Sequence, residues 1–330
     1  MGVSAQACAT IMSMNFVFFD IECASVYKYT AKICAFGYVL CDEKFNIIKK
    51  EDILINPKGK FHLMDGRGER GLVLPYEYSD FKKYPLFPEI YPKIKELLED
   101  SNNIVFGHAT LNDVNYLNLE TKRFHLPSFS FTYSDSQLMY MTSIGDFTRQ
   151  FGLEYITQNL DVEFTPHRAA DDAYATMKVV EALAKKHGCS GVELEKLLGI
   201  KRGRISDNRV SRPDSIKFAE YRRDKEQQKE ERSRRKVMFY NAISRKCRPE
   251  SDKFKGLTFN FSRLIEDKVD VSIPLVEKIR KLGGKYTDKV SECAVYVCEE
   301  GDDSIRTQNA LKLTNLKIIN LIKLGELLND

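Results

Sequence analysis

Three apolar runs joined by short connections constrain the fold of this chain more than any other feature. The runs are "NFVFFDIE" (15–22), "KICAFGYVL" (32–40) and "FNIIKKEDILINP" (45–57). Their length and their β-branched and aromatic content predict strands, and the short connections predict an antiparallel meander. Met14 directly precedes the first run, so residues 1–13 are expected to be an unstructured extension.

The next part of the chain alternates helical and strand patterns. Helices are predicted for "FPEIYPKIKELLED", "TLNDVNYLNLETKRF", "GLEYITQNL" and "ADDAYATMKVVEALAKKHG", with a short buried strand in "NIVFGH". The run "FSFTYSDSQLMYM" fits a strand or a helix. Strands followed by helix–strand–helix predict an α/β fold, a mixed sheet flanked by helices.

A second unit is predicted after residue 252, where the pattern of strands and helices restarts. Strands are expected in "FKGLTFNFS", "ECAVYVC" and "LKIIN", and helices in "VSIPLVEKIRKLGGK", "DSIRTQNALKL" and "LIKLGELL". This is a small α/β unit of βαβ character. The predicted organisation is therefore an extension (1–13), a first domain (14–200), a linker (201–252) and a second domain (253–330).

The predicted linker is strongly basic, although the whole chain has a formal net charge of only +4. Between Lys201 and Asp252 there are 17 Lys and Arg against 9 Asp and Glu, a net charge of +8. Such a segment attracts a nucleic-acid backbone. It is equally the composition of a solvated, partly helical linker.

Composition also limits the class of protein and its surroundings. The eight cysteines form no CxxC pair and no Cys/His cluster, so reduced thiols, and not zinc ligands or disulfides, are expected. No apolar run reaches the ~18 residues of a membrane span, and the N-terminus lacks a secretory pattern. We expect a cytoplasmic protein that does not enter a membrane.

Two carboxylates, Asp20 and Glu22, end the first predicted strand two residues apart. Side chains alternate along a strand, so both project from one face. Adjacent buried carboxylates are costly unless a cation compensates them. A pair of solvated carboxylates at a strand end is the simpler alternative.

Three further polar residues are candidates for the same site. Asp113 follows the "GH" pair in the first turn of a helix, where with Thr110 it also fits a capping box. In "HRAADDAYAT", helical periodicity turns Asp171 toward water and puts Asp172 on the flank of the apolar stripe, where it can reach a cleft. His167 precedes this helix on a loop, and either a structural or a catalytic role fits it.

Taken in order, these residues resemble the histidine-bearing (DEDDh, DnaQ-like) branch of the DEDD exonuclease superfamily, which includes the proofreading ε subunit of bacterial DNA polymerase III. The resemblance covers about residues 14–190 and includes "GHATLND" and "HRAADDA". It implies a ribonuclease-H-like sheet. It also implies that Asp20, Glu22, Asp113 and Asp172 hold two Mg²⁺ or Mn²⁺ ions, and that His167 activates the attacking water. Hard cations of this kind prefer carboxylate oxygen, and a pair of them suits phosphodiester hydrolysis.

Some positions depart from the family pattern. Cys23 follows Glu22 where the family often has threonine, Ala109 replaces an asparagine, and Asn112 replaces a phenylalanine. These differences concern recognition of the terminal nucleotide and not the metal ligands. Phe18, Phe19, Tyr76 and Tyr78 are aromatic candidates for base stacking, with Phe18 and Phe19 expected instead in the core.

Residues 253–330 resemble a BRCT domain, a module of DNA-processing proteins. The resemblance implies a small docking module for a protein or for DNA ends, or for a phosphoprotein if Ser262 and Arg306 cradle a phosphate. Arg263 stands where the family has glycine, and this favours simple docking. The complete chain is thus expected to be a 3′→5′ exonuclease acting on a nucleic acid with a free 3′ end, preferably DNA, in proofreading, repair or end trimming. An RNA 3′ exonuclease and a non-enzymatic scaffold are the alternatives.

Overall fold

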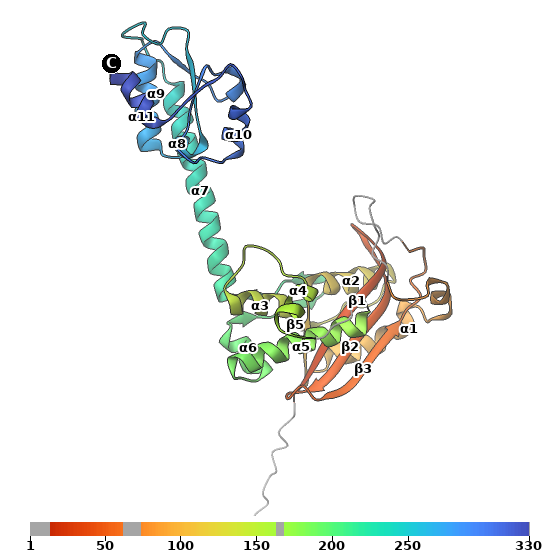
Figure 1. The fold of residues 1–330 in the computed structure, drawn as a ribbon. Helices are drawn as coiled ribbons and strands as arrows, with labels where there is room; N and C mark the ends of the chain where they lie inside the picture. Colours follow the sequence, from red (N-terminus) through yellow and green to blue (C-terminus); the bar gives the residue numbers. More distant parts are fainter. Residues whose placement is uncertain (1–13, 62–73, 163–167, 330) are drawn as a thin grey trace, which may run out of the picture. The chain divides into compact units, whose positions relative to one another are not determined.

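The computed structural model describes residues 14–61, 74–162 and 168–329, which fall into two compact units, Met1–Tyr221 and Arg222–Asp330 (Figure 1). The predicted N-terminal extension and the arginine-bearing "GRGERG" segment lie outside the described residues. So does His167, the candidate general base.

The first unit is built on one mixed sheet. Its strand order is β3-β2-β1-β4-β5-β7-β8. The predicted meander is confirmed, because β1 pairs antiparallel with β2 and β2 with β3, whereas β4 and β5 join β1 in parallel. The strands are β1 (Asn15–Tyr27), β2 (Thr30–Asp42), β3 (Ile47–Leu54), β4 (Asn103–Gly107), β5 (Phe131–Asp135), β7 (Gly203–Ser206) and β8 (Arg209–Ser211).

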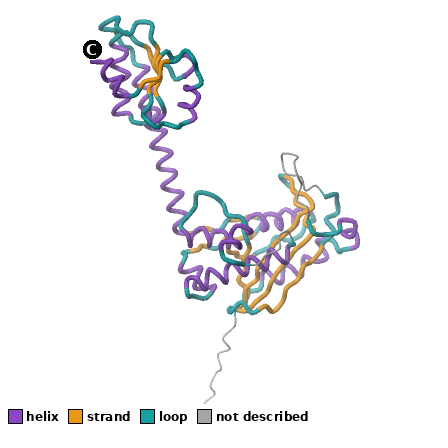
Figure 2. The backbone as a smooth tube through the Cα atoms, viewed as in Figure 1, coloured by secondary structure: helices purple, strands orange, loops and turns teal. Residues whose placement is uncertain are grey.

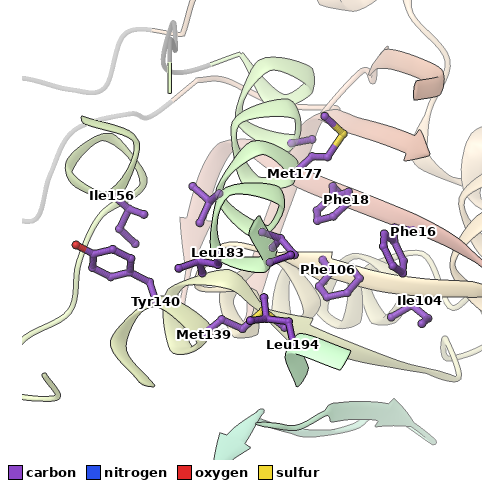
Figure 3. Close-up of a cluster of buried hydrophobic side chains, with 14 of the residues drawn as sticks. Phe16, Phe18, Ile104, Phe106, Met139, Tyr140, Ile156, Met177, Leu183 and Leu194 are labelled. Atoms are coloured by element: carbon purple, nitrogen blue, oxygen red, sulfur yellow. The ribbon is translucent and has the colours of Figure 1, made fainter. Parts of the chain in front are cut away.

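Helices cover both faces of this sheet, as the sequence pattern predicts. Alternate residues of β1 enter different cores: Phe16 and Phe18 pack against α5, whereas Val17 and Phe19 pack against α1 and α2. Figure 3 shows the core on the α5 face, with Phe16 and Phe18 of β1 beside Met177 of α5. The helices are α1 (Phe87–Glu99), α2 (Leu111–Arg123), α3 (Ser136–Ile144), α4 (Leu153–Asn159), α5 (Ala169–His187) and α6 (Gly191–Leu197). The ambiguous run "FSFTYSDSQLMYM" divides into β5 and α3, with Asp135 as the helix N-cap.

Helix α5 approaches the sheet most closely at Gly37. A Cβ atom built on Gly37 would lie 2.0 Å from the carbonyl carbon of Ala169 and 2.1 Å from the amide nitrogen of Ala170. Gly37 pairs with Asp20 on β1 and with Asp52 on β3. The missing side chain thus lets the first turn of α5 lie against the sheet beside Asp20.

This contact predicts that Gly37→Ala destabilises the first unit. Backbone atoms cannot move away as a side chain can, so overpacking here is expected to cost about 3 kcal/mol in free energy of unfolding. Thermal denaturation measures the loss. The matched control is Gly325→Ala in α11 (Leu321–Asn329), where a Cβ meets nothing within 4 Å; a loss of the same size there would contradict the explanation.

The prediction of a linker over residues 201–252 is wrong for its first part, residues 201–215, which form strands. β7 and β8 extend the main sheet, and two short strands, β6 (Ile200–Lys201) and β9 (Asp214–Ser215), pair with each other. The long helix α7 (Ile216–Ser244) follows; most of its side chains are exposed, and it begins in the first unit. The first domain therefore extends to about residue 221 and not to residue 200.

The second unit has a four-stranded parallel sheet in the order β11-β10-β12-β13 (orange strands, Figure 2). The strands are β10 (Thr258–Phe261), β11 (Lys285–Tyr286), β12 (Val295–Val297) and β13 (Lys317–Ile319), and the helices after α7 are α8 (Arg263–Glu266), α9 (Val269–Lys281), α10 (Ile305–Leu311) and α11. All three strands and three helices predicted from sequence are present. Gly283 adopts φ 85° after α9, in the left-handed region that glycine favours.

Among the described helices, none combines the length and the apolar character needed to cross a membrane.

Candidate active site

The candidate site lies in the middle of β1, on the face covered by α5; the prediction that the strand ends at Asp20 and Glu22 is wrong, because β1 continues to Tyr27. Asp20 and Glu22 continue the alternation of Phe16 and Phe18, so their carboxylates point toward α5. The strand register shifts on either side of Cys23, immediately after Glu22. Such β-bulges bend a strand and often occur beside active sites.

Three acidic side chains meet there. Ligand oxygens of Asp20, Glu22 and Asp172 all lie within 4.8 Å of one another. Asp172 is 8% exposed, whereas its neighbour Asp171 forms an ion pair with Lys50 at 2.6 Å. The structure separates the two aspartates as the helical periodicity predicts, with Asp172 buried against Asp20 and Glu22 and Asp171 partly exposed beside Lys50.

Asp113 contributes from the first turn of α2. It is 5% exposed, and its charge is the largest electrostatic contribution to the raised pKa of Asp20. The alternative interpretation as a capping box is not supported, because Thr110 makes no side-chain cap and its Oγ1 donates instead to the carbonyl of Ser134. The structure therefore brings Asp20, Glu22 and Asp172 together, with Asp113 close enough to raise the pKa of Asp20 by its charge, and the fifth predicted site residue, His167, lies outside the described residues.

The electrostatics of this cluster point to a cation. Burial, followed by repulsion from the other carboxylates, raises the pKa values of Asp20 and Asp113 well above the usual range. Burial raises the pKa of Glu22 to about 8, with Asp172 and Asp52 adding to the shift. Oxygen donors only, held close together with unfavourable mutual charge, fit hard divalent ions such as Mg²⁺ or Mn²⁺.

Sequence reasoning missed Asp52, which ties the start of α5 to the sheet. Its Oδ2 accepts hydrogen bonds from the Tyr76 hydroxyl at 3.0 Å and from Arg168 Nε at 3.1 Å. The Tyr76 hydroxyl in turn accepts from the amide of Ala169 at 3.2 Å. Tyr76, a candidate for base stacking, thus has a structural role, and the residue that follows His167 is held in place. No motif signals this network, because its members come from three distant segments.

The other stacking candidates and His108 also pack inside the protein. Phe18 and Phe19 are fully buried, as expected, and Tyr78 stacks on Phe61 with ring centroids 4.3 Å apart. His108 of the "GH" pair contacts Ser136 Oγ at 2.9 Å and the Phe151 carbonyl at 3.2 Å. Burial lowers its pKa to about 4, so it is a neutral structural histidine.

The phosphate cradle that the BRCT resemblance offered as the less favoured alternative is not supported in the second unit. Arg306 Nη1 lies 2.8 Å from the carboxylate of Glu266, and the guanidinium also donates to the carbonyls of Phe261 and Asp288. Ser262 is fully buried. The Arg306 guanidinium is thus held by two carbonyls and by Glu266, which also pairs with Arg263, and the sequence-based suggestion of a phosphoprotein partner gains no support.

The raised carboxylate pKa values predict that cation binding depends on pH. Without a cation, Glu22 keeps its proton up to a pH of about 8, so a divalent ion must displace protons below that pH. The apparent affinity for Mn²⁺ should therefore rise from pH 6 to about 8 and then level off. Calorimetric titration in buffers of different ionisation enthalpy measures the released protons.

The raised pKa of Glu22 also predicts how the stability of the metal-free protein changes with pH. In the folded chain Glu22 holds its proton between its ordinary pKa of 4.5 and about 8, whereas the unfolded chain releases it. The metal-free protein should therefore lose stability as the pH rises through this window, and Mn²⁺ should restore it. An affinity and a melting temperature that do not change between pH 6 and 8 would contradict this account.

Comparison with known proteins agrees with the sequence motifs. Residues 17–180 match the family model described as Exonuclease (RNase_T), so this segment is an exonuclease domain. No curated protein matches the sequence. The match ends before β6 and does not include the second unit, for which the BRCT resemblance stays a prediction.

Several solved structures are similar to the first unit at low sequence identity. A 3′-exonuclease described for its recognition of the histone mRNA stem-loop is 12% identical, with a TM-score of 0.48, over 62% of this chain and 71% of that one. Exonuclease I of E. coli with a dA16 oligonucleotide is 16% identical (TM-score 0.45), over 56% of this chain and 42% of that one. The nuclease domain of a DEDDh-family 3′ exonuclease bound to rAMP is also 16% identical (TM-score 0.44), over 55% and 95%. This chain thus spans less than half the length of the exonuclease I chain.

Proposed function

We propose that the exonuclease domain hydrolyses phosphodiester bonds one nucleotide at a time from the 3′ end of DNA and releases nucleoside monophosphates. The observation that carries this proposal is the convergence of Asp20, Glu22 and Asp172 within 4.8 Å, with Asp113 buried beside them. Hydrolysis of a phosphodiester places negative charge on the attacking and leaving oxygens. Divalent cations held by these carboxylates would stabilise that negative charge.

Each residue has a distinct task in this proposal. The four carboxylates hold two divalent cations, which supply positive charge to the oxygens of the reacting phosphate. Asp52, through Tyr76 and Arg168, fixes the first turn of α5 and hence the position of Asp172. His167, one residue before Arg168, accepts the proton of the attacking water in its neutral form.

DNA is the preferred substrate in this proposal because of the BRCT resemblance of the second unit. That support comes from the occurrence of the domain and not from a contact with DNA. An RNA 3′ exonuclease is the alternative, and proofreading, repair or end trimming is the proposed role. A scaffold without activity is disfavoured because all four acidic ligands are present.

Digestion of labelled oligonucleotides tests the proposal. Single-stranded DNA, duplex DNA and RNA of one sequence, labelled at the 5′ end, are incubated with Mg²⁺ or Mn²⁺. The proposal predicts a ladder that shortens from the 3′ end, with nucleoside 5′-monophosphates as products and DNA cleaved faster than RNA. Internal cuts, or products that carry a 3′-phosphate, would refute it; a faster RNA digestion would transfer the proposal to RNA.

The second unit is proposed to add affinity and not chemistry. Residues 222–252, which comprise most of α7 and the segment after it, have 11 Lys and Arg against 6 Asp and Glu. Deletion of residues 222–330, at the boundary between the units, should leave the cleavage of short oligonucleotides unchanged and weaken the binding of longer ones, most clearly at low salt. Fluorescence anisotropy at several salt concentrations measures the dissociation constant and its dependence on salt. An unchanged dissociation constant and salt slope would reduce this region to a spacer.

A further inference from the structure

A cavity of about 350 Å³ lies within the first unit, and Asn112, the residue before Asp113, lines it. It opens between the first turns of α2 and α3, the loop before α4, and the chain that leaves β8. Its polar and aromatic lining comes mainly from Asn112, Gln137, Phe147, Arg149, Arg212 and Phe218.

This cavity shares a structural element with the candidate active site. Asn112 and Asp113 are consecutive in the first turn of α2, but Asn112 is exposed toward the cavity and Asp113 is buried in the acidic cluster. The carboxylate of Asp135 fixes this turn by accepting from the amides of Ala109 (3.2 Å) and Thr110 (3.1 Å). A strand whose 3′ end reaches the carboxylates is therefore within reach of the cavity.

The cavity wall combines two arginines, Arg149 and Arg212, with the carboxylate of Asp135, whose oxygens accept hydrogen bonds from backbone amides. Arg149 and Arg212 are exposed, and among the described residues no acidic group forms an ion pair with either guanidinium. The nearest acidic influence on Arg149 is Asp146, whose pKa is lowered mainly by Thr148 and in smaller part by Arg149. Arg149 also lies over the rings of Phe151 and Tyr155, at 4.7 and 4.8 Å from their centroids, which holds the guanidinium in place without neutralising it.

Aromatic rings form the rest of the wall. The centroids of Phe147 and Phe218 are 5.3 Å apart, and Phe147 also lies 5.6 Å from Tyr221. Half-buried rings beside exposed guanidinium groups are the combination by which proteins bind unpaired nucleotides, because every base has a face that can stack. A volume of this size is at the lower end for ligand pockets, so it suits one nucleotide and not a duplex.

One side of this cavity comes from the extension of the sheet. Arg212, Pro213 and Phe218 follow β8, beyond residue 180 where the match to the exonuclease family ends. The segment after β8, together with the first turn of α7, therefore brings a cation and a ring to the wall of this cavity.

We propose that this cavity binds an unpaired nucleotide of the substrate strand upstream of the scissile phosphate. Arg149 and Arg212 contact its phosphate, and Phe147 and Phe218 contact its base. The inference rests on the proposed exonuclease function and adds to it residues, outside the acidic cluster, that hold the substrate strand upstream of the cleaved bond.

The test compares a substrate that reaches the cavity with one that does not. The long substrate is 5′-labelled dodecathymidylate, and the short one is the p-nitrophenyl ester of thymidine 5′-monophosphate, which has no upstream nucleotide. The variants are Arg149→Ala, Arg212→Ala and the double variant. The control is Arg209→Ala, which removes an exposed arginine of β8 that does not line the cavity.

For the double variant, the ratio of kcat/KM for dodecathymidylate to kcat/KM for the ester should fall by about 10-fold or more, since hydrogen bonds to charged groups are of this strength. The salt dependence of oligonucleotide binding should also become shallower, by about 0.7 in log–log slope for each phosphate that the variant no longer neutralises. The control should keep the wild-type ratio.

The possible failures are distinguishable. A wild-type protein that cleaves neither substrate overturns the proposed function itself. A wild-type protein that cleaves both, with double-variant kinetics that keep the ratio unchanged or lose both activities equally, overturns the nucleotide site alone. Equal losses for Arg209→Ala and for the cavity variants would do the same, because they would indicate a general effect of charge.

Discussion

Asp172→Ala is expected to lower phosphodiester hydrolysis by on the order of 10³-fold or more, whereas Asp171→Ala stays near the wild-type rate. Removing one carboxylate from a two-cation site removes several kcal/mol of charge stabilisation from the transition state. Asp172 is buried in the acidic cluster, but Asp171, the preceding residue of the same helix turn, points elsewhere and pairs with Lys50. Asp20→Ala should be as damaging as Asp172→Ala.

This pair of neighbouring aspartates provides its own control. Both changes remove one negative charge from the first turn of α5, so a general effect on the helix would be the same in both variants. Turnover of labelled DNA with Mn²⁺ and the melting temperature are measured on the same preparations. The account fails if Asp171→Ala is inactive while Asp172→Ala remains active.

His167→Ala is expected to lower kcat by about 10²–10⁴-fold, the usual range for loss of a general base, while Mn²⁺ still binds. The neutral imidazole is the active form, so the wild-type rate should rise with pH as His167 loses its proton and then level off. The variant should lose this rise.

A second histidine serves as the control for that experiment. His187 ends the same helix, and its Nε2 lies 2.8 Å from Ser143 Oγ, far along α5 from Asp172. His187→Ala should affect stability more than turnover. If His167→Ala melts early and yet cleaves at a near wild-type rate, His167 has a packing role only, and bulk solvent takes the proton.

The parts of the site that could be predicted from sequence are those encoded by local periodicity. Alternation along β1 places Asp20 and Glu22 on one face, and the helical period separates Asp172 from Asp171. Both rules need only the geometry of one element, and both hold in the structure. The same is true of the meander and of the strands and helices of the second unit.

What could not be predicted depends on contacts between distant segments or on weak local signals. The network of Asp52, Tyr76 and Arg168 exists only because β3, the loop before α1 and the start of α5 meet in space. Strands β7 and β8 are short and contain mostly polar and charged residues. Such a sequence is typical both of edge strands and of linkers. The spacing of Thr110 and Asp113 fits a capping box and equally a buried aspartate that binds a metal. Only the hydrogen bonds of Thr110 distinguish these two roles.

The central claim is that these four carboxylates form a two-cation hydrolytic site, and a Mn²⁺ titration with parallel turnover tests it most directly. Electron paramagnetic resonance counts the bound ions in the wild type and in Asp172→Ala, and cleavage of 5′-labelled DNA is followed at each Mn²⁺ concentration. The account predicts two ions per wild-type chain, a rate that rises as the second ion binds and vanishes with EDTA, and fewer ions with no cleavage in the variant. Full cleavage in EDTA, or a wild-type chain that binds no Mn²⁺, would contradict it.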